Sequence, residues 1–342
     1  MIGRLLAWYD AEKRSLPWRG SRDPYAILVS EIMLQQTQVS VVREPFERFM
    51  ERFPSVDVLA AAPAEAVLAA WSGLGYYRRA RNLHAAARAI ADAGEFPRSL
   101  DGLRALPGIG DYTAAAVGSI AFDLVEPVLD GNVLRVLARL EATSDDTARA
   151  VVRARLRAVA RELVDPARPG DSNQALMELG ATVCTPQKPA CTACPLNTRC
   201  AAWSAGEPER YPTARARRAT ERHALLAALV ERQGRFLFML RAEEKALLAG
   251  TWEVPWVALG EVAPERALAV RYGGRFTLGE PCGTVKHTIT FRSLAVEVRR
   301  GDFAGRAAAG VEAAWLSADE LSRRPHSSLV RKILRRAAAG KP

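Results

Sequence analysis

The spacing of apolar residues divides the chain into two parts of different character. Up to about residue 205, apolar positions recur at the intervals of an amphipathic helix, as they do at Val67, Leu68, Trp71 and Leu74. Residues that begin or end helices separate these segments, which are roughly three to five turns long. We therefore predict an all-helical first domain over residues 1–205.

After this helical part, the pattern changes to short apolar runs joined by glycine turns, which are typical of strands. The expected strands are residues 225–230, 235–240 and 285–298, and residues 329–338 are expected to form a closing helix. We interpret residues 206–222, which are rich in proline and arginine, as an interdomain linker. Residues 223–338 then form a small α+β domain, so the predicted fold class is multidomain, α followed by α+β.

The most informative stretch is LPGIGDYTAAAV, residues 106–117. Pro107 ends the preceding helix, and Gly108 and Gly110 permit a tight turn that other residues resist. A second helix begins near Asp111, and its free amides and N-terminus suit an anion such as a nucleic-acid phosphate. An ordinary helical corner can also contain Gly-x-Gly, so the whole string is needed to favour a binding site.

Composition and charge narrow the range of partners. The chain has 342 residues, of which 49% are hydrophobic and 25% charged, as in a globular protein large enough for two cores. Its formal net charge of +10 favours a polyanionic partner. No apolar run reaches membrane-spanning length, and residues 1–14 have the pattern of a charged amphipathic helix, not of a signal peptide. We expect a cytoplasmic, nucleoid-associated monomer with no membrane partner.

Four of the five cysteines are crowded into one segment. Cys184, Cys191, Cys194 and Cys200 have the spacing C-x6-C-x2-C-x5-C, which in a reducing compartment favours a metal or cluster over disulfides. Zinc accepts four thiolates, but its structural sites usually contain two separated C-x2–4-C pairs, and this segment has one. A [4Fe–4S] cubane needs four thiolates that one loop can supply, so the spacing favours a cluster with a structural role. Cys282 lies outside the pattern.

Two carboxylates stand in segments suited to acid–base chemistry. Glu31 lies among apolar residues such as Ile27 and Met33, where burial would raise the pKa of its carboxyl and make it a proton donor. Asp130 would cap the following helix, whose N-terminus favours the charged form. A solvent-facing glutamate and a purely capping aspartate are the plainer alternatives. One neutral and one ionised carboxyl suit cleavage of a glycosidic bond through an oxocarbenium-like transition state.

Taken together, these features resemble an adenine DNA glycosylase of the MutY family, with its helix-hairpin-helix and [4Fe–4S] loop. The similarity covers nearly all of residues 1–212 and includes the hairpin and the cysteine loop. The other similar segments are residues 16–19, 30–39, 73–77, 81–83, 130–135, 173–180 and 211–212. The resemblance implies removal, during base excision repair, of adenine mispaired with 8-oxoguanine or guanine in double-stranded DNA.

The resemblance also implies roles for individual residues. Glu31 would be the general acid and Asp130 the carboxylate that stabilises the sugar cation, with Tyr112 and Asn132 as active-site partners. Arg14, Leu16, Trp18 and Arg19 would line the base pocket, Gln36 and Tyr76 would enter the duplex beside the extruded base, and Leu106, Gly108, Gly110 and Thr113 would bind DNA. Trp18 could instead be a core residue, and Tyr76 could pack between helices.

One position distinguishes the two related classes of glycosylase. The endonuclease III enzymes carry a nucleophilic lysine where this hairpin has Tyr112. A lysine amine there would form a Schiff base with the sugar and permit strand cleavage. Its absence, with Glu31 present, favours a monofunctional glycosylase that uses water.

The second domain resembles the Nudix-like C-terminal domain of the same family, which reads 8-oxoguanine on the opposite strand. The string LLAGTWEVP at residues 247–255 carries this similarity, and no glutamate-rich Nudix helix follows, so nucleotide hydrolysis is not expected. Where the family has Phe-Ser-His, this chain has Ile289, Thr290 and Phe291. Phe291 cannot hydrogen-bond as histidine does, so a weaker lesion preference is expected while the adenine chemistry is kept.

Three functions are therefore compared. The first is excision of adenine opposite 8-oxoguanine or guanine, and the second is the same chemistry at a different mispair. The third is a non-catalytic module that marks damaged DNA through the hairpin and the cluster. The presence of both Glu31 and Asp130 weighs against the third.

Overall fold

The structure is a computed structural model that describes residues 1–213, 218–241, 250–260 and 263–339. The chain groups into two compact units: residues 1–61 with 82–216, and residues 62–81 with 217–342. The sequence predicted one cut between a helical and a mixed part. The structure differs because residues 62–81, although helical in pattern, group with the C-terminal part of the chain.

The first unit is helical, as predicted. Helix α2 begins at Pro24 because the Asp23 carboxylate accepts hydrogen bonds from the amides of Tyr25 and Ala26. The helices are α1 (Ile2–Glu12), α2 (Pro24–Leu34), α3 (Val39–Arg52), α4 (Val56–Ala61), most of α6 (Arg78–Ala93), α7 (Leu100–Ala105), α8 (Asp111–Phe122), α9 (Gly131–Leu140), α10 (Ala150–Arg161), α11 (Pro169–Thr182) and α12 (Ala201–Ser204), with 3-10 turns η1 (Cys191–Ala193), η2 (Asn197–Arg199) and η3 (Pro208–Arg210).

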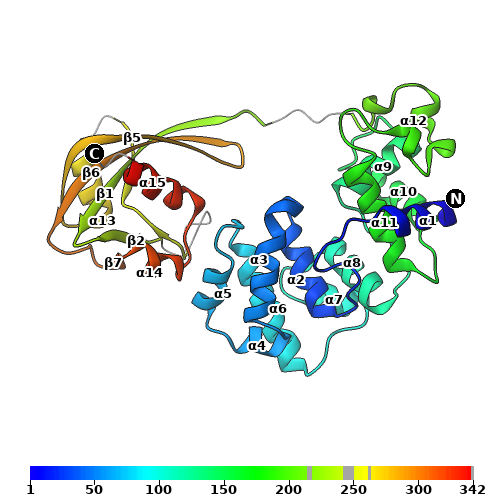
Figure 1. Cartoon of the computed structure of the whole chain (residues 1–342), viewed down its shortest axis with the longest axis horizontal. Coiled ribbons are helices and arrows are strands. Elements are labelled where there is room, and N and C mark those ends of the chain that lie inside the picture. The colour runs from blue at the N-terminus through cyan, green and yellow to red at the C-terminus, as the bar shows by residue number, and fades with distance from the viewer. Residues whose placement is uncertain (214–217, 242–249, 261–262, 340–342) are drawn as a thin grey trace. The chain divides into compact units, whose positions relative to one another are not determined.

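Helix α2 lies in the interior of this unit. All its residues from Tyr25 to Met33 are buried, as expected for a helix that is apolar on every side. It packs against α3 and α8 (Figure 1). A second cluster, which includes Leu5, Val133 and Leu176, joins α1, α8, α9, α10 and α11. The apolar composition of α2 therefore takes any polar residue on it out of water.

The second unit is built on a mixed sheet with the strand order β3-β2-β1-β6-β5, in which β4 also pairs with β1 and β7 with β2. Strands β1 and β6 are parallel, and the other pairs are antiparallel. The strands are β1 (Glu221–Arg232), β2 (Arg235–Leu240), β3 (Trp252–Glu253), β4 (Trp256–Ala258), β5 (Arg275–Ile289), β6 (Arg292–Ala304) and β7 (Ala313–Leu316), and the helices are α5 (Ala64–Ala70), α13 (Pro264–Tyr272), α14 (Ala318–Ser322) and α15 (Ser328–Ala339).

Strand β1 is buried on both faces because a helix covers each one. Leu225 and Leu229 belong to the core that contains Ile333 of α15, whereas Leu226 belongs to the core that contains Leu268 of α13. Such a strand reads as a continuous apolar run, as the sequence of β1 does. Figure 1 shows α15 and α13 beside the long strands of this unit.

The stretch 285–298, expected to be extended, consists of two strands. Strand β5 ends at Ile289 and β6 begins at Arg292, and the two form one long antiparallel hairpin. Thr290 occupies the turn with φ +57°. The three residues aligned with the Phe-Ser-His motif therefore lie at the tip of a hairpin.

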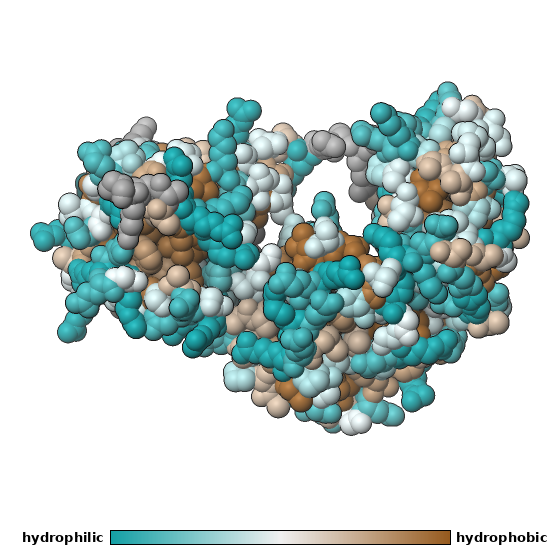
Figure 2. All heavy atoms as spheres, viewed as in Figure 1, coloured by the Kyte–Doolittle hydropathy of each residue, from teal (hydrophilic) through white to brown (hydrophobic). Residues whose placement is uncertain are grey.

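Hydrophilic side chains cover most of the face seen in Figure 2, and apolar side chains gather in a hollow of the C-terminal part of the chain. None of the helices that the structure describes is long and apolar enough to cross a membrane.

Candidate active site

Glu31 is a buried carboxyl, as its apolar neighbours predicted. It lies on α2 and is 5% exposed. Burial raises the pKa of Glu31 from 4.5 to about 7, and the nearby charge of Asp130 adds to the rise, while the Tyr112 hydrogen bond and the charge of Arg19 oppose it. A carboxyl with this pKa holds its proton in a large fraction of molecules at neutral pH, as a general acid requires.

A cavity of about 670 Å³ lies beside Glu31. This volume falls within the range of roughly 300–1,000 Å³ that is usual for sites of small organic groups. The cavity brings together segments far apart in the sequence: the loop after α1, the end of α2, the glycine hairpin, and parts of α9 and α11. The predicted site residues that line it are Arg14, Leu16, Trp18, Arg19, Glu31, Gln36, Gly108, Gly110, Tyr112, Thr113, Asp130 and Asn132.

Tyr112 orients the Glu31 carboxyl. Its hydroxyl donates to Glu31 Oε2 at 2.6 Å, and the same hydroxyl lies 3.4 Å from the Met177 sulfur. A protonated carboxyl carries its hydrogen on one oxygen only. With Oε2 accepting from Tyr112, Oε1 is the oxygen left to carry a transferable proton.

Asp130 caps α9, as predicted. One carboxylate oxygen accepts from the Val133 amide at 2.7 Å, and the other accepts from Asn132 Nδ2 at 3.2 Å. The helix terminus favours the ionised form of Asp130, as expected, but burial acts in the opposite direction and is the larger effect. Burial raises the pKa of Asp130, and the bonds from Val133 and Asn132 oppose the rise without cancelling it, because the loss of water outweighs the favourable helix terminus.

Glu178 is a second buried carboxylate of the cavity, and its role was not predicted from the sequence. Arg14 Nε donates to it at 2.6 Å and Arg19 Nη1 at 2.8 Å. Burial alone would raise the pKa of Glu178, but the two guanidinium groups outweigh burial and lower it. Glu178 is therefore the ionised carboxylate of the cavity wall. The sequence did contain one indication of a buried anion, because two arginines, Arg14 and Arg19, were both expected to line the pocket.

The glycine hairpin has the predicted geometry. Gly108 has φ +76°, and a Cβ there would lie within 2.4–2.6 Å of Asn82 side-chain atoms, so no other residue fits. Gly110 is the N-cap of α8 and has no side chain to satisfy the first amides, which leaves them for an anion. Leu106 and Thr113 are buried, and Thr113 also lines the cavity.

The four predicted cysteine ligands line one small cavity of about 20 Å³. None of them forms a disulfide. In the part of the chain that the structure describes, no group of three or more His, Cys, Asp or Glu residues is arranged to hold a metal ion. The convergence of four soft sulfur donors on one cavity nevertheless fits an iron–sulfur group.

Two arginines of α9 contact the cysteine loop, and one of them, Arg135, also contacts Asn132 in the cavity wall. Arg139, 2% exposed, donates to the Thr185 carbonyl at 2.7 Å and to Cys184 Sγ at 3.3 Å. Arg135 donates to the Cys184 carbonyl at 2.8 Å and to Asn132 Oδ1 at 2.8 Å. The loop therefore supports the end of α9 that carries Asp130.

Gln36 and Tyr76, the two predicted duplex-entering residues, share an unusual backbone. Gln36 has φ +56° and Tyr76 has φ +48°, and both side chains are exposed. Residues other than glycine rarely adopt this left-handed conformation, which occurs preferentially at functional sites. Gln36 lines the cavity of the first unit, and Tyr76 belongs to the second unit.

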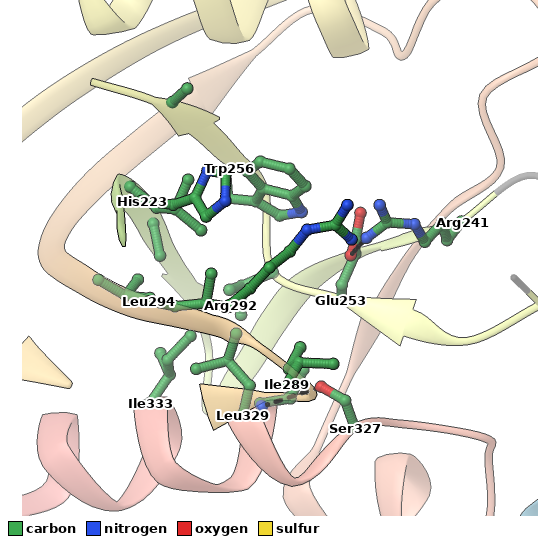
Figure 3. A pocket seen from close by; sticks show the side chains of 16 residues that line it. His223, Arg241, Glu253, Trp256, Ile289, Arg292, Leu294, Ser327, Leu329 and Ile333 are labelled. Carbon is green, nitrogen blue, oxygen red and sulfur yellow. Dashed lines mark hydrogen bonds and ion pairs between the residues drawn. The ribbon is translucent and has the colours of Figure 1, made fainter. Parts of the chain in front are cut away.

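The three residues at the tip of the β5–β6 hairpin make contacts within the second unit. Ile289 points into a cavity of about 330 Å³ in the second unit, together with Trp256 and Ser327 (Figure 3). Thr290 is exposed, and its hydroxyl donates to the Ile289 carbonyl at 2.6 Å. The Phe291 ring lies 3.6 Å from the Arg218 guanidinium.

Comparison with known proteins gives the family. The model of the HhH-GPD superfamily of base excision DNA repair proteins matches residues 29–162, and the NUDIX domain model matches residues 226–336. The adenine DNA glycosylase of Mus musculus is 37% identical over 97% of this chain and 76% of the mouse protein. That of Mycolicibacterium smegmatis is 41% identical over 74% of this chain and 85% of the relative. The chain belongs to the adenine DNA glycosylase family.

Solved structures agree with this family. A thermostable thymine-DNA glycosylase matches with a TM-score of 0.55 and 28% identity, over 60% of this chain and 95% of that protein. An endonuclease III–DNA complex matches with a TM-score of 0.50 and 24% identity over the same share of this chain, and it shows the common fold. The resemblance found in the sequence is thereby confirmed, as is the fold class of a helical glycosylase domain followed by a Nudix-like α+β domain.

Two segments used in the sequence comparison, residues 247–255 and Trp18, have specific places in the structure of this DNA glycosylase. Of the string 247–255, residues 247–249 lie outside the described residues, and Trp252 and Glu253 form β3. Trp18 is 8% exposed and packs edge-on against Phe46 with ring centroids 5.3 Å apart. It thus packs in the core and also lines the cavity.

Proposed function

We propose that this chain excises adenine mispaired with 8-oxoguanine or guanine by hydrolysing its N-glycosidic bond. The observation that carries the proposal is Glu31, a buried acid with a pKa of about 7 at the wall of a cavity of small-molecule size. The choice of adenine is supported by the names of the relatives, which are adenine DNA glycosylases.

The chemistry begins with proton transfer from Glu31. The Oε1 proton passes to a ring nitrogen of the extruded adenine, because Oε2 is occupied by Tyr112. The glycosidic C–N bond then breaks, and its electron pair leaves with the base. Glu31 remains as a carboxylate.

Asp130 acts on the sugar that is left behind. Its carboxylate stabilises the positive charge that develops at the sugar carbon, and the bonds from Val133 and Asn132 favour that ionised form. A water molecule adds to the carbon and gives its proton to the Glu31 carboxylate, which leaves an abasic site and restores the protonated acid. Tyr112 replaces the lysine that would form a Schiff base, so the strand remains intact.

Arg19 is suited to bind the adenine ring. Its Nη1 is held by Glu178, while its Nε is buried and has no hydrogen-bond partner among the described residues. Adenine ring nitrogens are hydrogen-bond acceptors, and Arg19 Nε is a donor in the wall of the same cavity. An ordered donor left without a partner is costly until a ligand satisfies it.

The cofactor we propose is a [4Fe–4S] cluster held by Cys184, Cys191, Cys194 and Cys200. When bound, such a cluster supplies a rigid covalent centre that can also carry one electron. The contacts of Arg135 and Arg139 with this loop indicate a structural role, namely orientation of α9. Double-stranded DNA is the proposed partner, with a phosphate at the free amides of the hairpin.

A second candidate keeps this chemistry but weakens the preference for 8-oxoguanine. The hairpin tip favours it, since Ile289 is turned into its own domain and Phe291 is covered by Arg218. One or two lost hydrogen bonds, at roughly 0.5–1.5 kcal/mol each, would lower the preference by about one to two powers of ten. The triple change Ile289→Phe, Thr290→Ser and Phe291→His should then raise it.

Single-turnover excision on duplexes with adenine opposite 8-oxoguanine, guanine and cytosine tests the proposal. We expect release of free adenine from the first two duplexes and none from Glu31→Gln. Equal rates on all three duplexes would refute the mispair assignment. If the triple change leaves the ratio of the 8-oxoguanine rate to the guanine rate unaltered, the hairpin tip is not the reader.

A further inference from the structure

The turn that carries Tyr76 has an unusual conformation. Tyr76 is 42% exposed and has a left-handed backbone, and two glycines just before it, Gly73 and Gly75, have φ +100° and +69°. A β-carbon at Gly73 would lie 2.9 Å from Arg331 Nη2. A tyrosine in such a conformation persists only where the surroundings hold it.

Part of the support comes from the residues next to the turn. Trp71 Nε1 donates to the Gly75 carbonyl at 3.1 Å, and Arg79 Nη2 donates to the Leu74 carbonyl at 3.1 Å. The Arg79 guanidinium lies 5.6 Å from the Trp71 ring and 5.4 Å from the Tyr76 ring. These contacts stabilise the turn through residues that are its neighbours in the sequence.

Residues near the C-terminus supply further contacts. Tyr77 is 3% exposed, and its hydroxyl donates to the His326 carbonyl at 2.5 Å. Ser72 Oγ donates to the same carbonyl at 3.3 Å. The acceptor is fixed in its turn, because the Trp252 amide of β3 donates to the Pro325 carbonyl at 2.7 Å. Both ends of the Tyr76 turn are thus bonded to one backbone carbonyl of the second domain.

We propose that the C-terminal domain docks on this turn and sets its conformation, with Tyr77 as the positioning residue for Tyr76. The segment that contacts the turn, residues 325–327, also lies near the tip of the β5–β6 hairpin. Ser327, which follows His326, lines the cavity that receives Ile289 (Figure 3). One short segment therefore contacts both the hairpin and the turn. This inference rests on the proposed function and on the role that the family resemblance implies for Tyr76, which is to enter the duplex beside the extruded base.

The variant Tyr77→Phe tests the docking because it removes the hydroxyl and keeps the ring. The matched control is Tyr25→Phe, since Tyr25 is equally buried and its hydroxyl donates to the Phe53 carbonyl at 2.7 Å, away from the turn. Hydrogen exchange of the amides from Gly73 to Arg79 is measured in the full, cluster-containing chain without DNA. We expect two- to tenfold faster exchange in Tyr77→Phe than in Tyr25→Phe, as for the loss of one hydrogen bond.

A second measurement tests whether docking serves Tyr76. In the Glu31→Gln background, the fluorescence of 2-aminopurine beside the mispaired adenine reports unstacking of the duplex. We expect Tyr77→Phe to reduce the unstacking signal two- to tenfold, and to have no further effect once Tyr76→Ala is present. The proposal would be overturned if the effects of Tyr77→Phe and Tyr76→Ala on the fluorescence simply add. It would also be overturned if the amides of the turn exchange no faster in Tyr77→Phe than in Tyr25→Phe.

The two proposals fail in different ways. If the wild-type chain releases no adenine from any mispair, the proposed function is wrong, and the exchange comparison still decides whether the domain holds the turn. If adenine is released but Tyr77→Phe matches Tyr25→Phe in both measurements, only the docking proposal is wrong.

Discussion

Replacing Glu31 by glutamine should abolish excision and also stabilise the helical unit, increasingly so as the pH rises. Glutamine keeps the shape of the side chain and can still accept the Tyr112 hydrogen bond at 2.6 Å. It has no proton to transfer, so the single-turnover rate should fall by more than about 10²-fold, the usual contribution of a general acid. Binding to mispaired DNA should persist.

The stability effect follows from the pKa of Glu31, which is raised from 4.5 to about 7 in the folded chain. Between these two values the unfolded chain has released its proton and the folded chain has kept it. The free energy of unfolding therefore falls as the pH rises through this window. At about 1.4 kcal/mol per unit of pKa difference, the loss amounts to roughly 3 kcal/mol above pH 7. Glutamine does not titrate, so the variant escapes this loss.

Thermal unfolding of the wild-type chain and of Glu31→Gln, measured side by side from pH 5 to pH 8, checks this reasoning. For a unit of about 200 residues, each kcal/mol shifts the midpoint by roughly 2–4 °C. The variant should therefore melt roughly 6–12 °C higher than the wild type at pH 8, and the difference should shrink towards pH 5. The wild-type excision rate should fall as the pH rises above 7, since less Glu31 is protonated.

A difference in melting temperature that does not change with pH would refute the raised pKa. A variant that still releases adenine at a near-normal rate would refute Glu31 as the acid. The two results are independent, because a buried glutamate could be costly for folding without taking part in chemistry. Both must hold for the assignment to stand.

Three further outcomes are expected. Anaerobically purified protein should contain about four iron atoms and four sulfides per chain, with broad visible absorption, and stoichiometric zinc without iron would contradict the cluster. Borohydride should trap no high-yield adduct with DNA, because Tyr112 stands where a Schiff-base lysine would be. Gly180→Ala should slow single-turnover excision by about 10–10²-fold, because its methyl group would lie 2.7 Å from Asn132 Cβ, whereas Gly3→Ala, with nothing within 4 Å, should leave the rate unchanged.

The local features of the site could be predicted from the sequence because each depends on near neighbours. The cap formed by Asp130, the turn at Gly108 and the burial of Glu31 all follow from residues within a few positions. The direction of the Asp130 pKa could not be predicted in this way. It depends on how much water the surrounding helices exclude, and those helices come from other parts of the chain.

Long-range pairings were likewise inaccessible to the sequence. Glu178 is ionised because Arg14 and Arg19, about 160 residues earlier, close on it. Tyr77 contacts His326 across 249 residues, and that pairing places a helical segment in the C-terminal unit. Arg14 and Arg19 indicate that a buried anion is needed but not which residue supplies it, since an apolar period or a capping residue describes only its own element.

Burial alone does not decide which carboxyl of the cavity becomes the acid. Glu31 and Glu178 are both almost fully buried, and yet the pKa of one is raised and that of the other is lowered. The difference lies in their partners. Glu31 is hydrogen-bonded by a neutral phenol, which stabilises the carboxylate only weakly, whereas Glu178 is bound by two guanidinium groups that stabilise it strongly. Of these two carboxyls, the group without a bound cation is the one that can keep a proton and give it away, and that group is Glu31.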